Sequence, residues 1–412
     1  MKSYDLIVCG AGPAGATAAA IAARAGLRVA LIEKFPLPRH KTCGGGMPMV
    51  MKDFLYDLAP DAFVESDVLY FRHTWNFGDS YLAPINLPDK DRKLSIWMVQ
   101  RPIFDDALAR QATRSGAELL DGAAVRSLTI EGNRVRVRGQ MVGNRGASSQ
   151  GSDFNVVADY VIGADGANGV TAKAAGLRQR RAIALGMEVE FPYQWSNQHP
   201  VLQSEIAHLE YGAVKRGYAW IFPKAEHLNV GAGVFHPGGG DARNARSVRE
   251  RLRQAIFNYL NSFQLPYDPE KLKFHAHPLP VWNGKEQVHS TDGRILLAGD
   301  AAGLINPFFG DGILHAVKSG AIAASCIAEG NSQAYSDRIH AEFAANFDAA
   351  RLLAQIFYRF PHVCYQYGVK HPKATHAAAQ LLAGNFTFSN IAGRGLRSVC
   401  RSMISRLIPV RG

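Results

Sequence analysis

The segment near the start of the chain has the residue spacing of a turn that binds a dinucleotide. Residues 4–33 read YDLIVCGAGPAGATAAAIAARAGLRVALIE: a buried-strand pattern, a glycine turn, a helix of small residues and a second strand that ends in an acid. Gly10 permits the tight turn, Gly12 lets backbone amides approach a pyrophosphate, and Gly15 lets the helix pack closely on the strand. Glu33 falls where an acceptor for a ribose hydroxyl is expected. Because strand, helix and acid all stand in the right places, we predict a dinucleotide site.

Two more glycine-rich turns follow apolar strands later in the chain. The first is GADGANG at 163–169, and the second lies in GRILLAGDAAGLINPFFGDGI at 293–313. An acid at a strand end, such as Asp300, accepts hydrogen bonds from sugar hydroxyls, and a helix that begins among small residues presents its amides to a phosphate or an electron-rich ring. Each turn alone is compatible with an ordinary strand-to-helix connection. The three together predict a long ligand with two sugar-like parts, which is the shape of FAD.

Composition and charge limit the classes of protein to consider. At 412 residues the chain exceeds what one hydrophobic core usually supports, so at least two lobes are expected. The net charge of +11 and the pI near 9.4 indicate an anionic partner, such as a phosphorylated substrate or an acidic membrane face. No nucleic-acid recognition module is present, so nucleic acid is not expected. The fourteen histidines show no metal-ligand spacing, and we assign no metal.

The cysteines and the apolar runs predict the compartment. The five cysteines are odd in number and form no CxxC pair, which is typical of reduced thiols in a cytoplasmic protein. No uninterrupted apolar run approaches the roughly 20 residues that a membrane-spanning helix needs. We therefore expect a cytoplasmic chain that does not cross a bilayer.

Periodicity along the chain predicts an α/β fold with a second, antiparallel lobe. Residues 183–236 alternate polar and apolar character, which favours an antiparallel sheet with one face available to a ligand, and the last part of the chain has helical patterns. The predicted division is a discontinuous Rossmann-like FAD domain at 1–62, 98–180 and 288–332, a substrate domain at 63–97 and 181–287, and a helical C-terminal region at 333–412.

The motifs resemble those of a known group of flavoproteins. GAGPAG, GADGANG and GDAAGLINPFFGDGI together resemble the FAD-dependent hydroxylase superfamily, over most of the first 330 residues. Within that superfamily, PLPRHKTCGGGMP at 36–48 and GYAWIFPKAEHLNVGAG at 217–233 resemble the signatures of geranylgeranyl reductases, which saturate isoprenoid double bonds. Lys215 and Arg216 depart from the small residues and prolines expected before the second motif, and leave the head-group preference open.

The resemblance assigns cofactor roles to particular residues. It implies that Asp165 lies near the pyrophosphate, that Asp300 binds the ribityl chain, and that Arg101 contacts the cofactor. Cofactor contacts are expected at Gly10, Gly12, Pro13, Ala14, Gly15, Glu33, Lys34, Cys43, Gly44, Gly45, Arg101, Asp165, Gly166, Gly299, Asp300, Gly310, Gly312 and Ile313.

Cys43 is the predicted catalytic residue. The family pattern places a cysteine followed by glycines beside the flavin, as in Cys43, Gly44 and Gly45. Reduction of an isolated alkene needs a hydride at one carbon and a proton at the other, and a thiol is largely protonated near neutral pH. Lys41 and Arg39 nearby favour the thiolate instead. Cys43 is therefore expected to donate the proton or to tune the flavin, and the alternative is a small residue that packs against the ring.

The second motif predicts a wall of the substrate site. In a strand, alternation puts Tyr218, Trp220 and Phe222 on one face, where rigid aromatic rings suit a polyprenyl chain. The resemblance adds Pro223 to the residues expected to bind the substrate. The alternative is that this aromatic stripe belongs to the core.

The expected activity is FAD-dependent reduction of double bonds in a geranylgeranyl or polyprenyl chain. The expected partner is a polyprenyl lipid or a prenyl diphosphate, and the expected electron donor is NADPH, with reduced ferredoxin as the alternative. Two rivals stay open: a monooxygenase or halogenase of the same superfamily, since YAWIFP distantly resembles the halogenase pattern WxWxIP, and a lipid-binding flavoprotein without turnover.

The end of the chain has a basic amphipathic pattern. GRGLRSVCRSMISRLIPVRG places Leu396, Val399 and Met403 on one helical face, with arginines grouped alongside. Such a helix lies at an anionic membrane surface or docks on its own domain. A peripheral position on the inner membrane face is thus one expectation.

Overall fold

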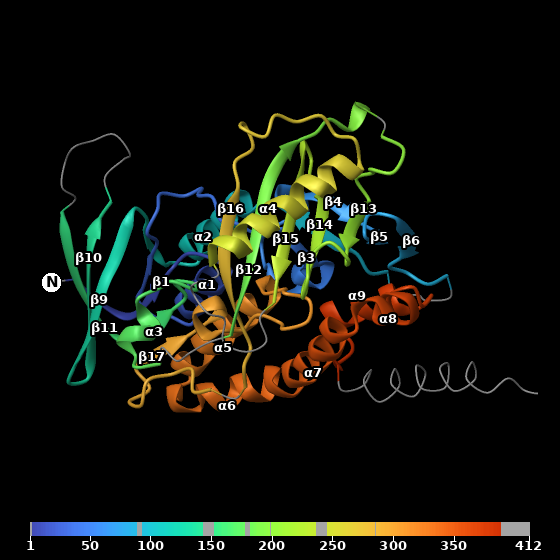
Figure 1. Ribbon diagram of the computed structural model, residues 1–412. Helices are drawn as coiled ribbons and strands as arrows, with labels where there is room; N and C mark the ends of the chain where they lie inside the picture. Colours follow the sequence, from blue (N-terminus) through green and yellow to red (C-terminus); the bar gives the residue numbers. More distant parts are fainter. Residues whose placement is uncertain are drawn as a thin grey trace, which may run out of the picture.

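The computed structural model describes residues 2–88, 93–142, 152–177, 182–197, 199–235, 245–284 and 286–388. Two large sheets lie side by side, and a row of helices extends from the first sheet beneath the second (Figure 1). The predicted α/β class, with a Rossmann-like part, an antiparallel sheet and C-terminal helices, is confirmed. The predicted domain boundaries stay a proposal. The amphipathic pattern of Leu396, Val399 and Met403 lies outside the described residues.

The first sheet is built around a buried parallel core. Its strand order is β8 (Glu118–Leu120), β2 (Val29–Ile32), β1 (Lys2–Cys9), β11 (Asp153–Gly163), β10 (Arg134–Met141) and β9 (Ala123–Glu131), and β17 (Ile295–Leu297) also pairs with β11. The central strand β1 pairs in parallel with β2 on one side and with β11 on the other. Both of its faces are covered, which explains the continuous apolar run in its second half.

Small residues let helices pack tightly on this sheet. α1 (Pro13–Arg24) is mostly alanine and contacts α5 (Ile313–Ala328) and α2 (Arg101–Arg114). A Cβ on Gly320 of α5 would lie 2.1 Å from the carbonyl oxygen of Ala14, so only glycine permits this approach. The close packing fixes the N-termini of α1 and α5 relative to the strand ends.

The second sheet is mainly antiparallel and has two different faces. Its order is β16 (His275–Val281), β12 (Ala182–Pro192), β15 (His227–Val234), β14 (Gly217–Pro223), β13 (Ile206–Glu210), β5 (Tyr70–Trp75) and β6 (Asp79–Pro84). α4 (Ala245–Ser262) lies across one face, where Val189, Ile221 and Val230 join a core cluster (Figure 1). The opposite face carries the alternate residues and is turned toward the cavity described below.

A small third sheet and the C-terminal helices complete the surroundings of the cavity. β3 (Gly46–Pro48) and β4 (Val64–Val68) flank β7 (Ile96–Val99). The helices are α3 (Thr171–Ala174), α6 (Tyr335–Ile339), α7 (Ala345–Arg359), α8 (Pro361–Cys364) and α9 (Ala374–Leu382), with π-helical turns at His340–Ala344 and Tyr365–Val369. Among the described helices, none combines the length and the apolar character needed to cross a membrane.

Candidate functional site

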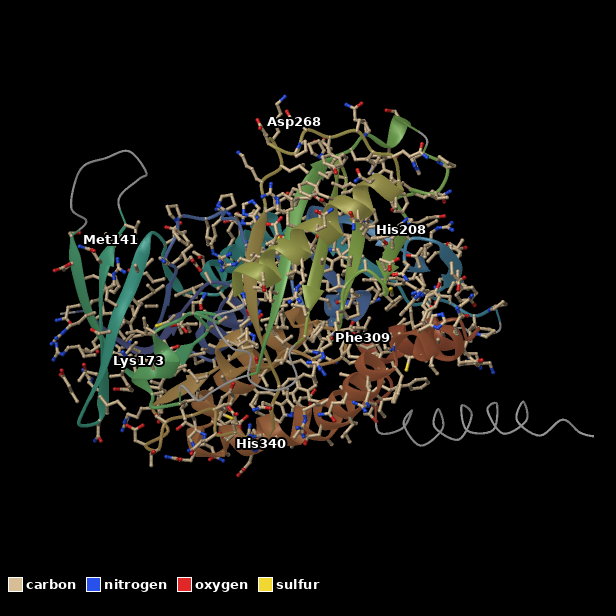
Figure 2. The ribbon with its side chains drawn as sticks, viewed as in Figure 1. Met141, Lys173, His208, Asp268, Phe309 and His340 are labelled. Atoms are coloured by element: carbon tan, nitrogen blue, oxygen red, sulfur yellow. The ribbon has the colours of Figure 1, made fainter. Side chains whose placement is uncertain are left out.

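A continuous cavity of about 1860 Å³ runs from the glycine turns of the first sheet to the C-terminal helices. One end is lined by polar residues and glycines, among them Gly12, Glu33 and Asp300, and the other by aromatic and aliphatic side chains. Figure 2 labels Phe309, which lies where the second sheet meets these helices. The loop that carries Cys43 lines the same cavity.

The first glycine turn has the close contacts that its spacing predicts. Gly10 has a φ of +101°, and a Cβ there would lie 2.3 Å from the carbonyl oxygen of Ala164. A Cβ on Gly15 would lie 1.8 Å from the oxygen of Gly10, so Gly15 packs helix against turn and does not line the cavity. Gly12 is the N-cap of α1. A Cβ built on it would lie 3.8 Å from a guanidinium nitrogen of Arg39 and 3.9 Å from one of Arg101. Helix amides and two cations therefore converge on one point, which suits a pyrophosphate.

A buried ion-pair network holds these two arginines. Arg101 donates two hydrogen bonds to Asp105, at 2.8 and 2.9 Å. Arg39 lies 2.9 Å from Asp105 and 3.0 Å from Glu33. Glu33 also accepts a hydrogen bond of 2.9 Å from the amide of Ala11. Burial alone would lower the pKa of Arg101, but its electrostatic interactions with Asp105 and Cys43 outweigh burial and raise that pKa. The guanidinium groups thus stay charged at the predicted pyrophosphate site.

The third glycine turn places an acid beside two basic side chains. Asp300 lies 3.9 Å from the Nζ of Lys41 and 3.8 Å from the Nε2 of His277. Burial opposes its ionisation, but the interactions with His277, Lys41 and Arg101 prevail and keep the pKa of Asp300 below its ordinary value. Asp300 is therefore ionised at neutral pH, as an acceptor for ribityl hydroxyls must be.

The glycines around Asp300 approach other segments closely. Gly299 and Gly310 have positive φ, and a Cβ on Gly312, the N-cap of α5, would lie 3.9 Å from Asp300 Oδ1. Gly299, Gly310, Gly312 and Ile313 all line the cavity.

The second glycine turn meets the first at Gly10. Asp165 and Gly166 line the cavity there, and both oxygens of Asp165 accept hydrogen bonds from Thr171 at the start of α3. Burial raises the pKa of Asp165. Through its two hydrogen bonds to Thr171, Asp165 fixes the start of α3 beside the predicted pyrophosphate site.

Cys43 lies where the polar and apolar parts of the cavity join. Its Sγ accepts a hydrogen bond of 3.3 Å from the amide of Gly45 and interacts with Arg101. Its own amide donates a hydrogen bond of 2.8 Å to Glu188 Oε1 on β12. The second sheet thus fixes the backbone of Cys43, while an amide and a guanidinium face its sulfur.

Glu188 belongs to a buried polar cluster beneath this loop. It is 1% exposed, and burial raises its pKa to about 7. Asn229 donates to Glu188 at 3.1 Å and accepts from the indole N–H of Trp220 at 2.8 Å. Lys224, also 1% exposed, donates hydrogen bonds of 2.8 Å to the carbonyls of Gly44 and Val99. Polar groups of three strands therefore set the position of the loop at Cys43.

The aromatic residues of β14 line the cavity as a row. Tyr218, Trp220 and Phe222 are half-buried and line it, and Tyr218 donates a hydrogen bond of 2.5 Å to the carbonyl of Phe309. Pro223 does not line the cavity. Strand alternation turns it to the buried face of the sheet, away from Phe222. The resemblance predicts a substrate contact at Pro223, but the structure does not place this residue in the lining of the cavity.

The remaining part of the cavity is apolar and reaches the C-terminal helices. Its lining there includes Phe71, Leu209, Tyr211, Phe357, Val363 and Leu382. Buried His73 lies in this wall, with its Nδ1 3.1 Å from the hydroxyl of Tyr211 and its Nε2 2.9 Å from that of Thr375, and burial lowers its pKa to about 3. His73 therefore adds no charge to this wall at neutral pH.

The structure brings nearly all predicted site residues to one cavity. Of the expected cofactor and substrate residues, all but Gly15 and Pro223 line it, including the exposed Lys34. Sequence reasoning gave no site role to the lining residues Glu188, His277 and Asp311, and it gave Arg39 and Lys41 only an effect on the thiol of Cys43. The one sequence signal for Glu188 is an acid within GMEVEF, in a strand whose other residues are mainly apolar.

Comparison with known proteins identifies the group to which this site belongs. Residues 3–342 match the family model described as FAD binding domain. The chain is 31% identical to a digeranylgeranylglycerophospholipid reductase of Methanothrix thermoacetophila, over 79% of this chain and 78% of the relative.

Solved structures share the fold. A geranylgeranyl bacteriochlorophyll reductase-like protein of Thermoplasma acidophilum superposes with a TM-score of 0.72 at 21% identity, covering 93% of this chain and 92% of that one. The flavin-dependent brominase Bmp2 superposes with a TM-score of 0.66 at 17% identity, covering 96% and 100%. At these identities the structures support the fold alone.

The residues present fit FAD. The cradle at Gly10 and Gly12 excludes larger side chains, two arginines face it, and the ionised Asp300 lies along the same cavity. With the match over residues 3–342 and the relative at 31% identity, the chain belongs to the geranylgeranyl reductase family of FAD-dependent oxidoreductases.

Proposed function

We propose that this protein reduces carbon–carbon double bonds in a geranylgeranyl or other polyprenyl chain. The observation that supports this most directly is the contact between the loop of Cys43 and Gly44 and the aromatic strand β14, at the point where the polar part of the cavity joins its apolar part. A long hydrocarbon in the apolar part would there present a double bond to the predicted flavin position.

The chemistry divides between the cofactor and the chain. When bound and reduced, FAD supplies the hydride for one alkene carbon. Cys43 holds a proton at Sγ for the other carbon, and the π electrons of the double bond form the new C–H bond to that proton. The resulting thiolate is stabilised by the amide of Gly45 and by Arg101, until solvent returns a proton. Tyr218, Trp220 and Phe222 hold the chain and exclude water.

The proposed substrate is a polyprenyl lipid or a prenyl diphosphate. The mainly apolar wall beyond Phe222 favours the hydrocarbon, and the relative at 31% identity is named a digeranylgeranylglycerophospholipid reductase. Because this wall would contact the hydrocarbon, it would not discriminate between a lipid head group and a diphosphate. NADPH is the proposed electron donor, with reduced ferredoxin as the alternative, since FAD would occupy the one GxGxxG turn.

Two activities compete with this proposal. A monooxygenase or halogenase of this fold would consume oxygen, and the brominase shows that the fold carries such chemistry in another protein. A lipid-binding flavoprotein would bind the chain without turnover.

One experiment separates the three. The FAD-loaded protein is reduced with dithionite under anaerobic conditions and mixed with geranylgeranyl diphosphate or a digeranylgeranyl lipid, while flavin absorbance and product mass are followed. A reductase re-oxidises its flavin and adds two mass units for each bond saturated. Fast substrate-dependent oxygen uptake without anaerobic saturation would establish the oxygenase class, and the absence of any re-oxidation would establish the binding protein.

A further inference from the structure

The apolar end of the cavity opens at the surface between α7, α8 and α9. Around this opening lies a group of exposed apolar side chains, here called the rim: Leu352, Ile356, Phe360, Val363, Tyr367 and Phe386. All except Phe360 also line the cavity. Leu352, Phe360 and Ile356 are 59%, 54% and 45% exposed, respectively. Large apolar groups gathered at one opening mark an interaction site more often than isolated surface residues do.

The rim lies in a part of the chain that contains no acids. From Ala349 to Gly412 the sequence has no Asp or Glu, whereas arginines and lysines recur throughout. In the described part, Lys370 is paired with Asp79 at 2.8 Å and Arg351 with Asp348 at 3.7 Å, so the positive charge beside the rim comes mainly from Arg359 and Lys373, which are both exposed. Apolar side chains flanked by exposed cations are the pattern of a surface that binds an anionic bilayer.

We propose that the rim docks on an anionic membrane surface and loads a lipid chain from it directly into the cavity. Continuity between rim and cavity favours a bilayer over a protein partner, because lining residues such as Ile356 and Tyr367 would meet acyl chains at the opening. The loading step rests on the proposed function, whereas docking does not require turnover. Docking at the rim differs from docking through residues 394–407, because the rim consists of described residues of α7, of α8 and of the segments that follow α7, α8 and α9.

Vesicle binding by the full FAD-loaded chain tests this proposal. Sedimentation with vesicles of phosphatidylcholine alone is compared with vesicles that also contain phosphatidylglycerol. The wild-type protein should bind the mixed vesicles more strongly, and added salt should weaken that binding. Ile356→Glu and Phe360→Glu should each lower the partition coefficient by about tenfold or more, because each removes an apolar group from the interface and adds a repelled charge.

The matched control is Ile103→Glu. Ile103 lies on α2, is 41% exposed and is thus an isoleucine of similar exposure on another helix. Its substitution should leave vesicle binding unchanged. Equal binding by wild type and both rim variants would overturn the proposal, and so would an equal loss in Ile103→Glu. Binding that disappears on removal of residues 389–412 but is insensitive to the rim variants would also overturn it, as would a dimer that buries the rim in place of vesicle binding.

A conservative variant covers the case in which a charged substitution disturbs folding. Phe360→Trp should give tryptophan emission that is quenched by brominated acyl chains beyond the quenching of the wild-type tryptophans. No additional quenching would contradict docking at the rim. Because this measurement involves no turnover, a protein that docks but fails to re-oxidise its flavin would refute the reductase proposal and leave docking intact.

Discussion

Gly44 lies directly against the ring of Phe222. A Cβ built on Gly44 would be 2.9 Å from two carbons of that ring and 3.3 Å from the indole nitrogen of Trp220. Gly44 and Phe222, which are 178 positions apart in the sequence, therefore bring the two motifs into contact. The glycine gives the aromatic strand access to the loop of Cys43, and the position of each depends on the other.

Gly44→Ala should disturb this contact while leaving the cofactor bound. The added methyl group needs Phe222 or the loop to move, and such overpacking costs about 1–3 kcal/mol. We expect a lower melting temperature and substrate-dependent flavin re-oxidation slowed by about tenfold or more. Gly46→Ala is the matched control, since a Cβ there meets its nearest neighbours at an ordinary 3.6 Å. Equal behaviour of the two variants would show that the Gly44 contact has no role.

Cys43→Ser should retain FAD and slow re-oxidation by substrate. A hydroxyl is a far weaker acid than a thiol, and loss of a positioned general acid costs about 10²–10⁴-fold in rate. Stopped-flow absorbance at the flavin band, with prenyl substrate under anaerobic conditions, measures the effect. An unchanged rate would remove Cys43 from the mechanism. Loss of FAD would instead indicate a purely structural role for the residue.

The glycine turns could be predicted from the sequence because their backbone conformation and close contacts require glycine at particular positions. A positive φ at Gly10 and the 1.8 Å approach at Gly15 are steric demands that glycine alone meets, so spacing predicts them. Alternation correctly put Tyr218, Trp220 and Phe222 on one face. The same rule puts Pro223 on the opposite face, so the expected substrate contact there, which rests on the family resemblance, does not agree with strand alternation.

The buried polar cluster of Glu188, Asn229 and Lys224 could not be predicted from the sequence, because its contacts join residues that are far apart in the chain. Glu188 faces Cys43, 145 residues away, and Lys224 faces Gly44, 180 residues away. In the sequence, Glu188 and Lys224 are each a charged residue in or beside a strand pattern, and no neighbouring residue indicates the partner. The ion pair between Arg39 and Asp105, 66 residues apart, arises in the same way.

Lys224→Met should loosen the loop by removing its buried cation. The ammonium group donates to the carbonyls of Gly44 and Val99, and both acceptors would lose a charged partner. Because a buried acceptor left unsatisfied costs about 1–3 kcal/mol, the urea midpoint should fall. Lys271→Met, at a side chain that is 83% exposed, should leave the midpoint unchanged. A stable Lys224→Met protein with wild-type kinetics would show that the loop holds without this anchor.

Glu188 should make the stability of the protein depend on pH in a characteristic direction. Burial raises its pKa from 4.5 to about 7, so between these pH values the folded state keeps a proton that the unfolded chain has lost. The free energy of unfolding therefore falls as pH rises through this window, by about 3 kcal/mol for this residue.

Glu188→Gln removes that titration while preserving an oxygen acceptor for the amide of Cys43. Relative to wild type, the variant should gain stability steadily from about pH 4.5 to about pH 7, and the difference should then level off. Urea unfolding of both proteins across this range gives the difference directly. Glu226→Gln, at an exposed position beside β15, controls for the loss of a carboxylate and should show no such trend. Parallel stability curves for wild type and Glu188→Gln would mean that Glu188 is ionised throughout, with Lys224 as its compensating charge.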